Sequence, residues 1–314
     1  MSPDDLARVA RGLVAHHKGL LAIDESIGTC NRRFAALEVS QTAEMRRDWR
    51  ELLVTTPGLS RSISGVILYD ETIRETTSTG ESFVSALTRV GIVAGIKVDT
   101  GTTDLAGHPG EKITEGLDGL GARLENYAAM GARFAKWRGV IAIGDTIPSR
   151  GCIEANAQAL ARYAVLCQHA GLVPMIEPEV LMAGCHDLAR CADVTEAVLR
   201  AVFHHCYEQG VALESVILKT NMVLAGADCP IQPGLDEISD ATLTVLLSAV
   251  PAAVPAIAFL SGGQSAGLAT ARLNAMNARF RGRMPWQLAF SFARAIQQPA
   301  LEIWRGRADR VHTA

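Results

Sequence analysis

The sequence lacks the features of a membrane protein and of a nucleic-acid-binding protein. None of its apolar runs approaches the ~20 residues that a membrane-spanning helix needs. Residues 1–8 contain no apolar core of the kind found in signal peptides. The 314 residues carry a formal net charge of -3, so no overall positive field is present to attract nucleic acid. We therefore expect a cytoplasmic protein with neither a membrane nor a nucleic acid among its partners.

The sequence also lacks the spacings that hold metals, disulfides or dinucleotides. Its seven cysteines are odd in number and form no CxxC pair, which favours reduced thiols. Its eight histidines include no HExxH motif, so we expect no metal site. No GxGxxG motif follows the first apolar run, residues 19–24, which argues against the open, doubly wound sheet that is the main alternative fold.

What the chain does have is a large apolar fraction arranged in a repeating order. Hydrophobic residues make up 48% and charged residues 20% of the sequence, as in a globular protein with a large core. No linker, charge block or low-complexity segment divides it. We therefore expect one domain that spans residues 1–314.

Short apolar runs alternate with amphipathic helical patterns along the whole chain. The expected strands are residues 19–24, 63–69, 91–97, 133–138, 173–179, 215–222, 256–263 and 287–294. The expected helices are residues 3–17, 42–53, 82–90, 114–130, 152–170, 194–209, 239–249, 266–278 and a segment that ends at residue 304. About eight strand–helix units with nearly continuous apolar strands predict a (β/α)₈ barrel, an α/β fold.

Chemically active residues gather at the ends of these expected strands. In a barrel of this kind, the catalytic residues lie at the C-terminal ends of the strands. The residues at those ends are Asp24, Lys97, Lys136, Glu177, Lys219, Ser261 and Arg294. Six of these seven side chains are ionisable, although ordinary strand-to-helix turns carry mainly uncharged polar residues.

Lys219 stands at the end of the run Val216-Ile-Leu218, where two interpretations are open. Its stem could run along the apolar surface with its ammonium group in water. Alternatively, a desolvated amine at this position could attack a carbonyl and form a Schiff base. A free lysine has a pKa of about 10.4, so full activation at pH 7 requires lowering that pKa by about three, or about 4 kcal/mol. Desolvation and a second cation nearby, such as Lys136, can lower the pKa of Lys219 by this amount.

Side chains alternate between the two faces of a strand, so residues two apart share a face. Lys136 and Arg138 should therefore point in one direction, and so should Glu177 and Glu179. The two glutamates could be structural partners of nearby lysines. They could also hold different pKa values and divide acid and base duties between them.

Two groups of residues could hold phosphates on opposite sides of Lys219. The glycine-rich turn at residues 260–265 offers backbone N–H groups, and Arg294 at the next strand end offers a guanidinium fork. On the other side, Ser26, Thr29, Lys97 and Arg33 could form a second site, although Ser26 and Thr29 could equally be ordinary turn or capping residues. Two anion sites around an amine indicate a bisphosphorylated carbonyl substrate.

Several segments resemble class I fructose-bisphosphate aldolase, and together they run from about residue 20 to about residue 305. They are LAIDESIG (21–28), GVILY (65–69), GIKVD (95–99), LDGL (117–120), FAKWR (134–138), EPE (177–179), LKTNMV (218–223), FLSGGQS (259–265) and SFAR (291–294). The resemblance implies reversible cleavage of fructose 1,6-bisphosphate to dihydroxyacetone phosphate and glyceraldehyde 3-phosphate. It also implies a homo-oligomer, commonly a tetramer, and a protonated imine as the electron sink, so that neither a metal nor another cofactor is needed.

The resemblance implies a role for each candidate residue. Lys219 would form the Schiff base with the C2 ketone, Glu177 would act as its acid and base, and Asp24 would take the C4 hydroxyl proton. Lys136 and Glu179 would tune and position this centre. The 1-phosphate would be held by Ser261, Gly262 and Arg294. The 6-phosphate side would be lined by Ser26, Thr29, Lys97, Arg33 and Arg138.

The sequence departs from the family pattern at three places. Ala293 stands where the pattern has a glycine before the phosphate-binding arginine, and Thr220 stands where it has a proline. No tyrosine follows Tyr207, whereas many members of the family carry a terminal tyrosine that assists protonation of the enamine. These departures keep open the same chemistry on another phosphosugar, such as sedoheptulose 1,7-bisphosphate, and a catalytically weakened scaffold protein. A metal-dependent aldolase is a further alternative.

Overall fold

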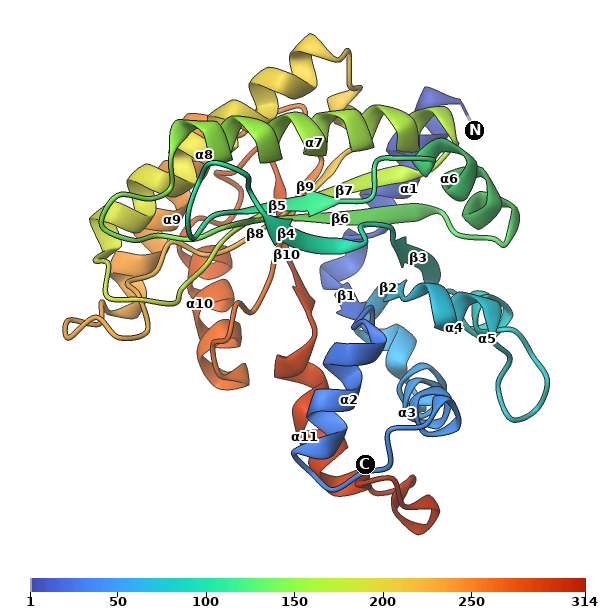
Figure 1. The fold of residues 1–314 in the computed structure, drawn as a ribbon. Coiled ribbons are helices and arrows are strands. Elements are labelled where there is room, and N and C mark those ends of the chain that lie inside the picture. Colours follow the sequence, from blue (N-terminus) through green and yellow to red (C-terminus); the bar gives the residue numbers. More distant parts are fainter. Residues whose placement is uncertain (1) are drawn as a thin grey trace.

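Eight parallel strands close into a barrel in the computed structural model, which describes residues 2–314 apart from the side chain of His16 (Figure 1). The barrel strands are β1 (Gly19–Ala22), β2 (Ile63–Leu68), β3 (Val93–Lys97), β6 (Phe134–Ile141), β7 (Val173–Val180), β8 (Ile217–Thr220), β9 (Ala256–Phe259) and β10 (Gln287–Phe292). Each strand pairs with its neighbour in the chain order, and β1 closes the ring against β10. The expected (β/α)₈ barrel is confirmed.

Helices surround this barrel, and one of them closes its end (Figure 1). They are α1 (Pro3–Gly12), α2 (Ile27–Ala35), α3 (Ala43–Thr55), α4 (Asp70–Arg74), α5 (Phe83–Arg89), α6 (Leu120–Ala129), α7 (Arg150–His169), α8 (Leu188–Glu208), α9 (Leu235–Ala249), α10 (Ala266–Arg279) and α11 (Arg294–Trp304). Short 3-10 turns lie at Ala15–His17, Leu59–Arg61, Leu213–Ser215 and Ala308–Arg310. Leu6, Ala10 and Leu13 pack against side chains inside the barrel, so α1 and the residue after it close its N-terminal end.

The helix expected over residues 194–209 begins six residues earlier, at Leu188, and the helix expected over residues 114–130 is also wrong at its start. Residues 112–115 form β5 (Lys112–Glu115), which pairs with β4 (Gly101–Asp104) in an antiparallel hairpin after β3, and the helix begins only at Leu120. Gly116 has a φ of 120° and Gly119 has a φ of 64°, and both values are left-handed conformations that a helix interior does not contain. The short helices α2 and α4 also lie outside the expected set.

The barrel interior is filled from its N-terminal end by small and aliphatic side chains together with the ring of Phe134. Leu20 and Ala22 of β1 point inward, while Leu21 packs outward against the helices. Phe134 fills the base so fully that a Cβ added at Gly95 would lie 2.3 Å from its ring. This close approach requires glycine at that position of β3.

In β3, β6, β7 and β8, and at the end of β1, the inward-facing positions change from apolar to charged toward the C-terminal end of the strand. In β7, Val173 and Met175 belong to the interior cluster, and Glu177 and Glu179 continue the same alternation at the upper end. Apolar packing therefore holds the lower half of the barrel and supplies a rigid, water-poor support for charged groups in the upper half.

Candidate active site

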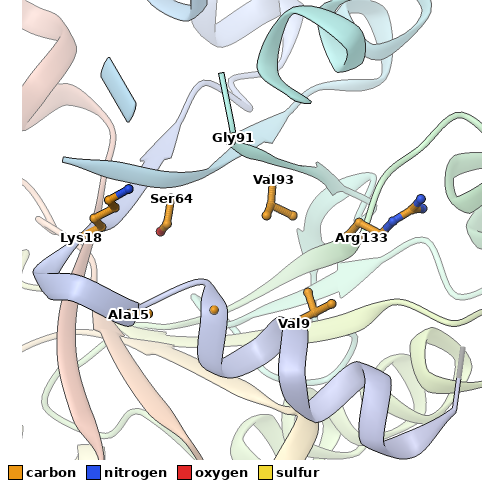
Figure 2. A pocket seen from close by; sticks show the side chains of 8 residues that line it. Val9, Ala15, Lys18, Ser64, Gly91, Val93 and Arg133 are labelled. Carbon is orange, nitrogen blue, oxygen red and sulfur yellow. The ribbon is translucent and has the colours of Figure 1, made fainter. Parts of the chain in front are cut away.

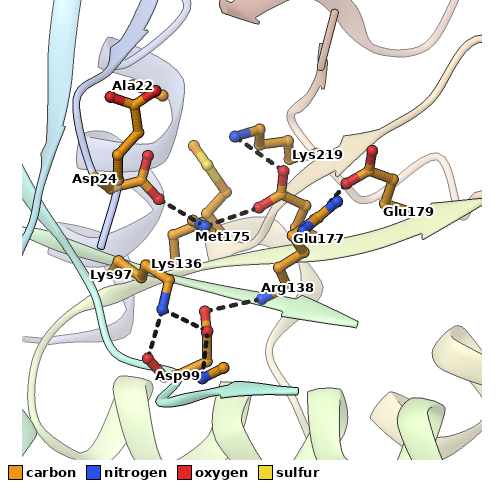
Figure 3. A network of polar contacts seen from close by, with 12 residues as sticks. Ala22, Asp24, Lys97, Asp99, Lys136, Arg138, Met175, Glu177, Glu179 and Lys219 are labelled. Carbon is orange, nitrogen blue, oxygen red and sulfur yellow. Dashed lines mark hydrogen bonds and ion pairs between the residues drawn. The ribbon is translucent and has the colours of Figure 1, made fainter. Parts of the chain in front are cut away.

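A chain of four charged side chains crosses the C-terminal mouth of the barrel (Figure 3). Nζ of Lys219 lies 3.0 Å from Oε1 of Glu177. The other oxygen, Oε2 of Glu177, lies 3.1 Å from Nζ of Lys136. The same Lys136 nitrogen lies 2.7 Å from Oδ2 of Asp24. Two lysines and two carboxylates thus alternate in charge, contributed by four different strands or strand ends.

Burial makes these ion pairs strong. Lys219 is 4% exposed and Lys136 and Glu177 are each 3% exposed, so the snorkelling interpretation of Lys219 is wrong. Burial alone would raise the pKa of Asp24, but attraction to Lys136 and then Lys219 outweighs it and lowers that pKa to about 2. The same balance of burial against nearby lysines lowers the pKa of Glu177. For Lys136, burial would lower the pKa, but Asp24 and Glu177 raise it above its ordinary value.

A second ionic group borders the first. Nε of Arg138 donates a hydrogen bond to Glu179, which is 7% exposed, and the Arg138 side chain remains 40% exposed. Burial alone would lower the pKa of Arg138, but attraction to the Glu179 carboxylate outweighs burial and raises that pKa above its ordinary value. Nζ of Lys97 lies 2.5 Å from Oδ1 of Asp99 and 2.7 Å from its carbonyl oxygen. Lys136 and Arg138 therefore share the inward face of β6, as their spacing predicts, and Lys97 faces the same side from β3.

A cavity lined mainly by polar residues, with one cationic residue, Arg294, and one acidic residue, Glu302, lies over the turn between β9 and α10. Ser261, Gln264 and Arg294 belong to its lining, and Arg294 is exposed there as the first residue of α11. Gly262 and Gly263 have φ values of 58° and 95°, so this turn needs residues without a side chain. Ser265 caps α10 by accepting a hydrogen bond from the N–H of Leu268, so the helix N-terminus opens toward the turn.

The residues expected on the opposite phosphate side have other structural partners. Ser26 is the N-cap of α2 and accepts a hydrogen bond from the N–H of Thr29, so its capping role is confirmed. Nη1 of Arg33 lies 2.5 Å from Oε1 of Glu25 and 2.7 Å from Oε1 of Gln297. These bonds tie α2 to α11, which lies beside it in Figure 1.

Sequence reasoning missed three residues that hold this site together. Asp99 binds Lys97 and also accepts a hydrogen bond from the N–H of Arg138. Glu25 pairs with Arg33, and Gln297, which is fully buried, donates to the carbonyl oxygen of Ala22. The sequence alone could have indicated Asp99 as a site residue, because it lies two residues after the candidate Lys97. Gln297 had none, because its partners lie at the other end of the chain.

Ala293 does not have a left-handed backbone. Its φ is -109° and its ψ is -93°, at the N-cap position of α11. Its side chain packs against the apolar cluster inside the barrel. Alanine in place of the glycine of the family pattern is therefore not forced into a left-handed backbone here.

Another cavity opens at the opposite, N-terminal end of the barrel (Figure 2). Val9 and Ala15 line it from the α1 segment, and Lys18 and Arg133 lie at its two sides. None of the expected site residues belongs to its lining. Among residues 2–314, no group of three or more His, Cys, Asp or Glu side chains is arranged to hold a metal ion. No helix of that same range is long and apolar enough to cross a bilayer.

A (β/α)₈ barrel with a buried lysine–carboxylate chain at its C-terminal mouth and a glycine-rich turn beside it defines a barrel enzyme that acts on a phosphorylated carbonyl compound. A sequence model of the family "Glycolytic: Fructose-bisphosphate aldolase class-I" matches residues 5–314. The chain belongs to this family. It is accordingly a lyase, and its reaction is the aldol cleavage of fructose 1,6-bisphosphate by Schiff-base chemistry.

Similar proteins agree with this membership. A Xylella fastidiosa protein named "Probable fructose-bisphosphate aldolase class 1" is 56% identical over 97% of this chain and 90% of its own length. "Fructose-bisphosphate aldolase 5, cytosolic" of Arabidopsis thaliana is 49% identical over 99% of this chain and 86% of its own length. The solved structure of fructose-bisphosphate aldolase from Plasmodium falciparum, in complex with TRAP and a small-molecule inhibitor, superposes with a TM-score of 0.97. That protein is 42% identical, and the match covers 99% of this chain and 90% of that one.

Proposed function

We propose that Lys219 is the residue that forms the Schiff base with the C2 ketone of fructose 1,6-bisphosphate. The observation that carries this proposal is the contact of its Nζ with Oε1 of Glu177 at 3.0 Å inside a pocket where both groups are buried. A carboxylate at this distance can take a proton from the ammonium group and so free the amine for attack.

Glu177 is the acid and base for the steps at C2. After the amine attacks, the carbinolamine must lose its hydroxyl group as water, which requires a proton from a neighbouring acid. Glu177 receives that proton on the oxygen that faced Lys219 and returns it to complete the dehydration. Its second oxygen stays against Lys136, which keeps the carboxyl group oriented throughout.

Asp24 accepts the proton of the C4 hydroxyl group as the C3–C4 bond breaks. A carboxylate with a pKa of about 2 is a weak base, so its contact with Lys136 must loosen before it can accept that proton. Lys136 already touches Glu177 at 3.1 Å, so a small movement toward Glu177 releases Asp24. The electron pair of the broken bond flows into the protonated imine, which gives the enamine of dihydroxyacetone phosphate and free glyceraldehyde 3-phosphate.

The two phosphates of the substrate lie on opposite sides of this centre. The 1-phosphate binds at the glycine-rich turn through Ser261, the backbone of Gly262 and the guanidinium group of Arg294. The 6-phosphate side consists of Lys97 and Arg138, with Ser26, Thr29 and Arg33 at the start of α2. Glu179 holds Arg138 by accepting a hydrogen bond from Nε of Arg138.

Borohydride trapping tests the assignment of Lys219. The protein is incubated with dihydroxyacetone phosphate and sodium borohydride, and the modified peptide is identified by mass spectrometry. We expect one adduct on the peptide that contains Lys219 and none in a Lys219→Met variant. Lys136→Met is the matched control, because it removes the other buried lysine and should leave the Lys219 peptide as the site of any adduct. An adduct on Lys136 in the unmodified protein would overturn the assignment.

We further propose that residues 1–314 act as one domain, that the protein is cytoplasmic and that it forms a homo-oligomer such as a tetramer. The first proposal is supported by the strand order, since the closed ring joins β1 to β10. The second is supported by the relatives named cytosolic. Sedimentation velocity over a range of concentrations measures the oligomeric state, and a monomer at all concentrations would contradict the third proposal.

A further inference from the structure

Arg272 occupies a position where an apolar side chain is expected. It lies on α10, on the helix face that also carries Ala269, Leu273 and Met276, and all four are buried. Arg272 itself is only 9% exposed. Long charged side chains are seldom buried to this degree without a partner of opposite charge.

No carboxylate lies within ion-pair distance of Arg272 among residues 2–314. Its one hydrogen bond runs from Nη1 to Oε1 of Gln264 at 2.7 Å, and its buried Nε has no partner in the described part of the chain. The other strongly buried arginines differ in this respect, because Arg46 and Arg50 both bind Glu71 at 2.5 and 2.7 Å. Burial without a compensating anion lowers the pKa of Arg272.

The acceptor of that hydrogen bond belongs to the wall of the phosphate cavity. Gln264 lines the cavity together with Ser261 and Arg294, and its backbone N–H donates to the carbonyl oxygen of Ser261 at 2.9 Å. Because Arg272 donates a hydrogen bond to the amide oxygen of Gln264, the amide nitrogen of Gln264 points away from the arginine. This nitrogen lies 3.8 Å from Sδ of Met222. Arg272 thus fixes which end of the Gln264 amide can donate.

We propose that Arg272 is a positioning residue for the phosphate group that binds at the turn between β9 and α10. It orients the Gln264 amide and places an uncompensated positive charge behind the turn, and a bound phosphate supplies the anion that the free protein lacks. The inference rests on the proposed 1-phosphate site at Ser261, Gly262 and Arg294. It adds a residue outside that set, on the far side of the turn from the substrate.

A role of Arg272 in packing alone and a role in phosphate binding predict different effects of its replacement on stability. The helix face around Arg272 is apolar, so a methionine of similar length should fit it and avoid the burial of an unpaired charge. If Arg272 serves only packing, its replacement should lower stability and leave phosphate affinity unchanged. If it serves phosphate binding, replacement should leave stability equal or higher and weaken binding.

The test compares Arg272→Met with Arg279→Met, a control on the same helix whose arginine binds the exposed Asp236 and Asp240. Two quantities are measured: the concentration of dihydroxyacetone phosphate that gives half-maximal borohydride trapping, and the KM for glyceraldehyde 3-phosphate in the condensation direction. For Arg272→Met we expect the first to rise about tenfold and the second to change by less than about twofold. The melting temperature should not fall, and Arg272→Lys should restore much of the affinity.

Arg294→Met separates failure of this inference from failure of the proposed function. If Arg294→Met weakens trapping and Arg272→Met does not, the phosphate site stands and the role of Arg272 is refuted. If neither variant weakens trapping, the phosphate assignment and the role of Arg272 both fall. A lower melting temperature with unchanged half-saturation in Arg272→Met would also refute the proposal, since it would show a packing role alone.

Discussion

Nζ of Lys219 lies 3.0 Å from Oε1 of Glu177, and both side chains are almost completely shielded from water. Glu177 is the only group of the chain Asp24–Lys136–Glu177–Lys219 that touches both lysines. The four charges sum to zero, which is how the barrel mouth keeps two ammonium groups in a region of low dielectric constant. Removing either carboxylate should therefore affect stability and catalysis together.

Glu177→Gln keeps the shape of the side chain and removes its charge. We expect the free energy of unfolding to fall by about 3 kcal/mol, because two buried lysines then share one carboxylate. We expect kcat to fall at least about 100-fold, because an amide cannot exchange the proton needed for dehydration at C2. Urea unfolding and steady-state cleavage measure these quantities. Glu208→Gln, at an exposed end of α8, is the control, and a normal kcat in Glu177→Gln would contradict its role.

The depressed pKa of Asp24 predicts how stability depends on acid. The pKa is about 2 in the folded protein and 3.8 for the ordinary carboxyl group, so the unfolded chain binds the proton first as the pH falls. The stabilisation is complete above about pH 5 and is lost as the pH falls from about 4 to about 2, to a total of about 2 kcal/mol. Glu177 contributes in the same direction, because its pKa is lowered too.

Unfolding free energies measured in urea between pH 5 and pH 2.5 test this for the unmodified protein and for Asp24→Asn. The variant should be less stable at pH 5 and should lose less stability on acidification. Equal pH slopes for the two proteins would show that Asp24 does not have the lowered pKa.

Lys97→Met should distinguish the two phosphate sides. Lys97 is held by Asp99 on the side proposed for the 6-phosphate, and charged hydrogen bonds contribute about 1.5–3 kcal/mol. We expect kcat/KM for fructose 1,6-bisphosphate to fall about 10- to 100-fold. With fructose 1-phosphate, which has no 6-phosphate, the fall should be less than about twofold. Arg294→Met should lower kcat/KM for both substrates, and an equal effect of Lys97→Met on both would reject the assignment.

Ala293→Gly tests whether the departure from the family pattern changes substrate use. Because the φ of Ala293 is -109°, its backbone is not left-handed, and glycine would remove a methyl group that packs on the barrel interior. We expect the free energy of unfolding to fall by about 0.5–1 kcal/mol. The kcat/KM values for fructose 1,6-bisphosphate and sedoheptulose 1,7-bisphosphate should each change by less than about twofold. A tenfold gain with either substrate would show that the methyl group crowds the phosphate.

Periodicity in the sequence was sufficient to predict most of the barrel. The apolar runs at residues 63–69 and 173–179 match β2 and β7 to within one residue at each end. The hairpin of β4 and β5 is not predicted, and the helix expected over residues 114–130 overlaps the end of β5 and includes Gly116 and Gly119, which both have positive φ. Alternation along β6 also placed Lys136 and Arg138 on one face, since that alternation is a local property of an extended strand.

The kinds of charged group that end the strands, and the face on which each lies, follow from the order of residues along the chain. Which distant groups touch depends on the tertiary structure: Lys136 binds Asp24 as well as Glu177, Arg33 is held by Gln297, and Arg272 is buried behind the turn between β9 and α10. Facing direction follows from the two-residue period of one strand. Contacts between distant segments depend on the register of eight strands and on the packing of the helices around them, which no single segment encodes.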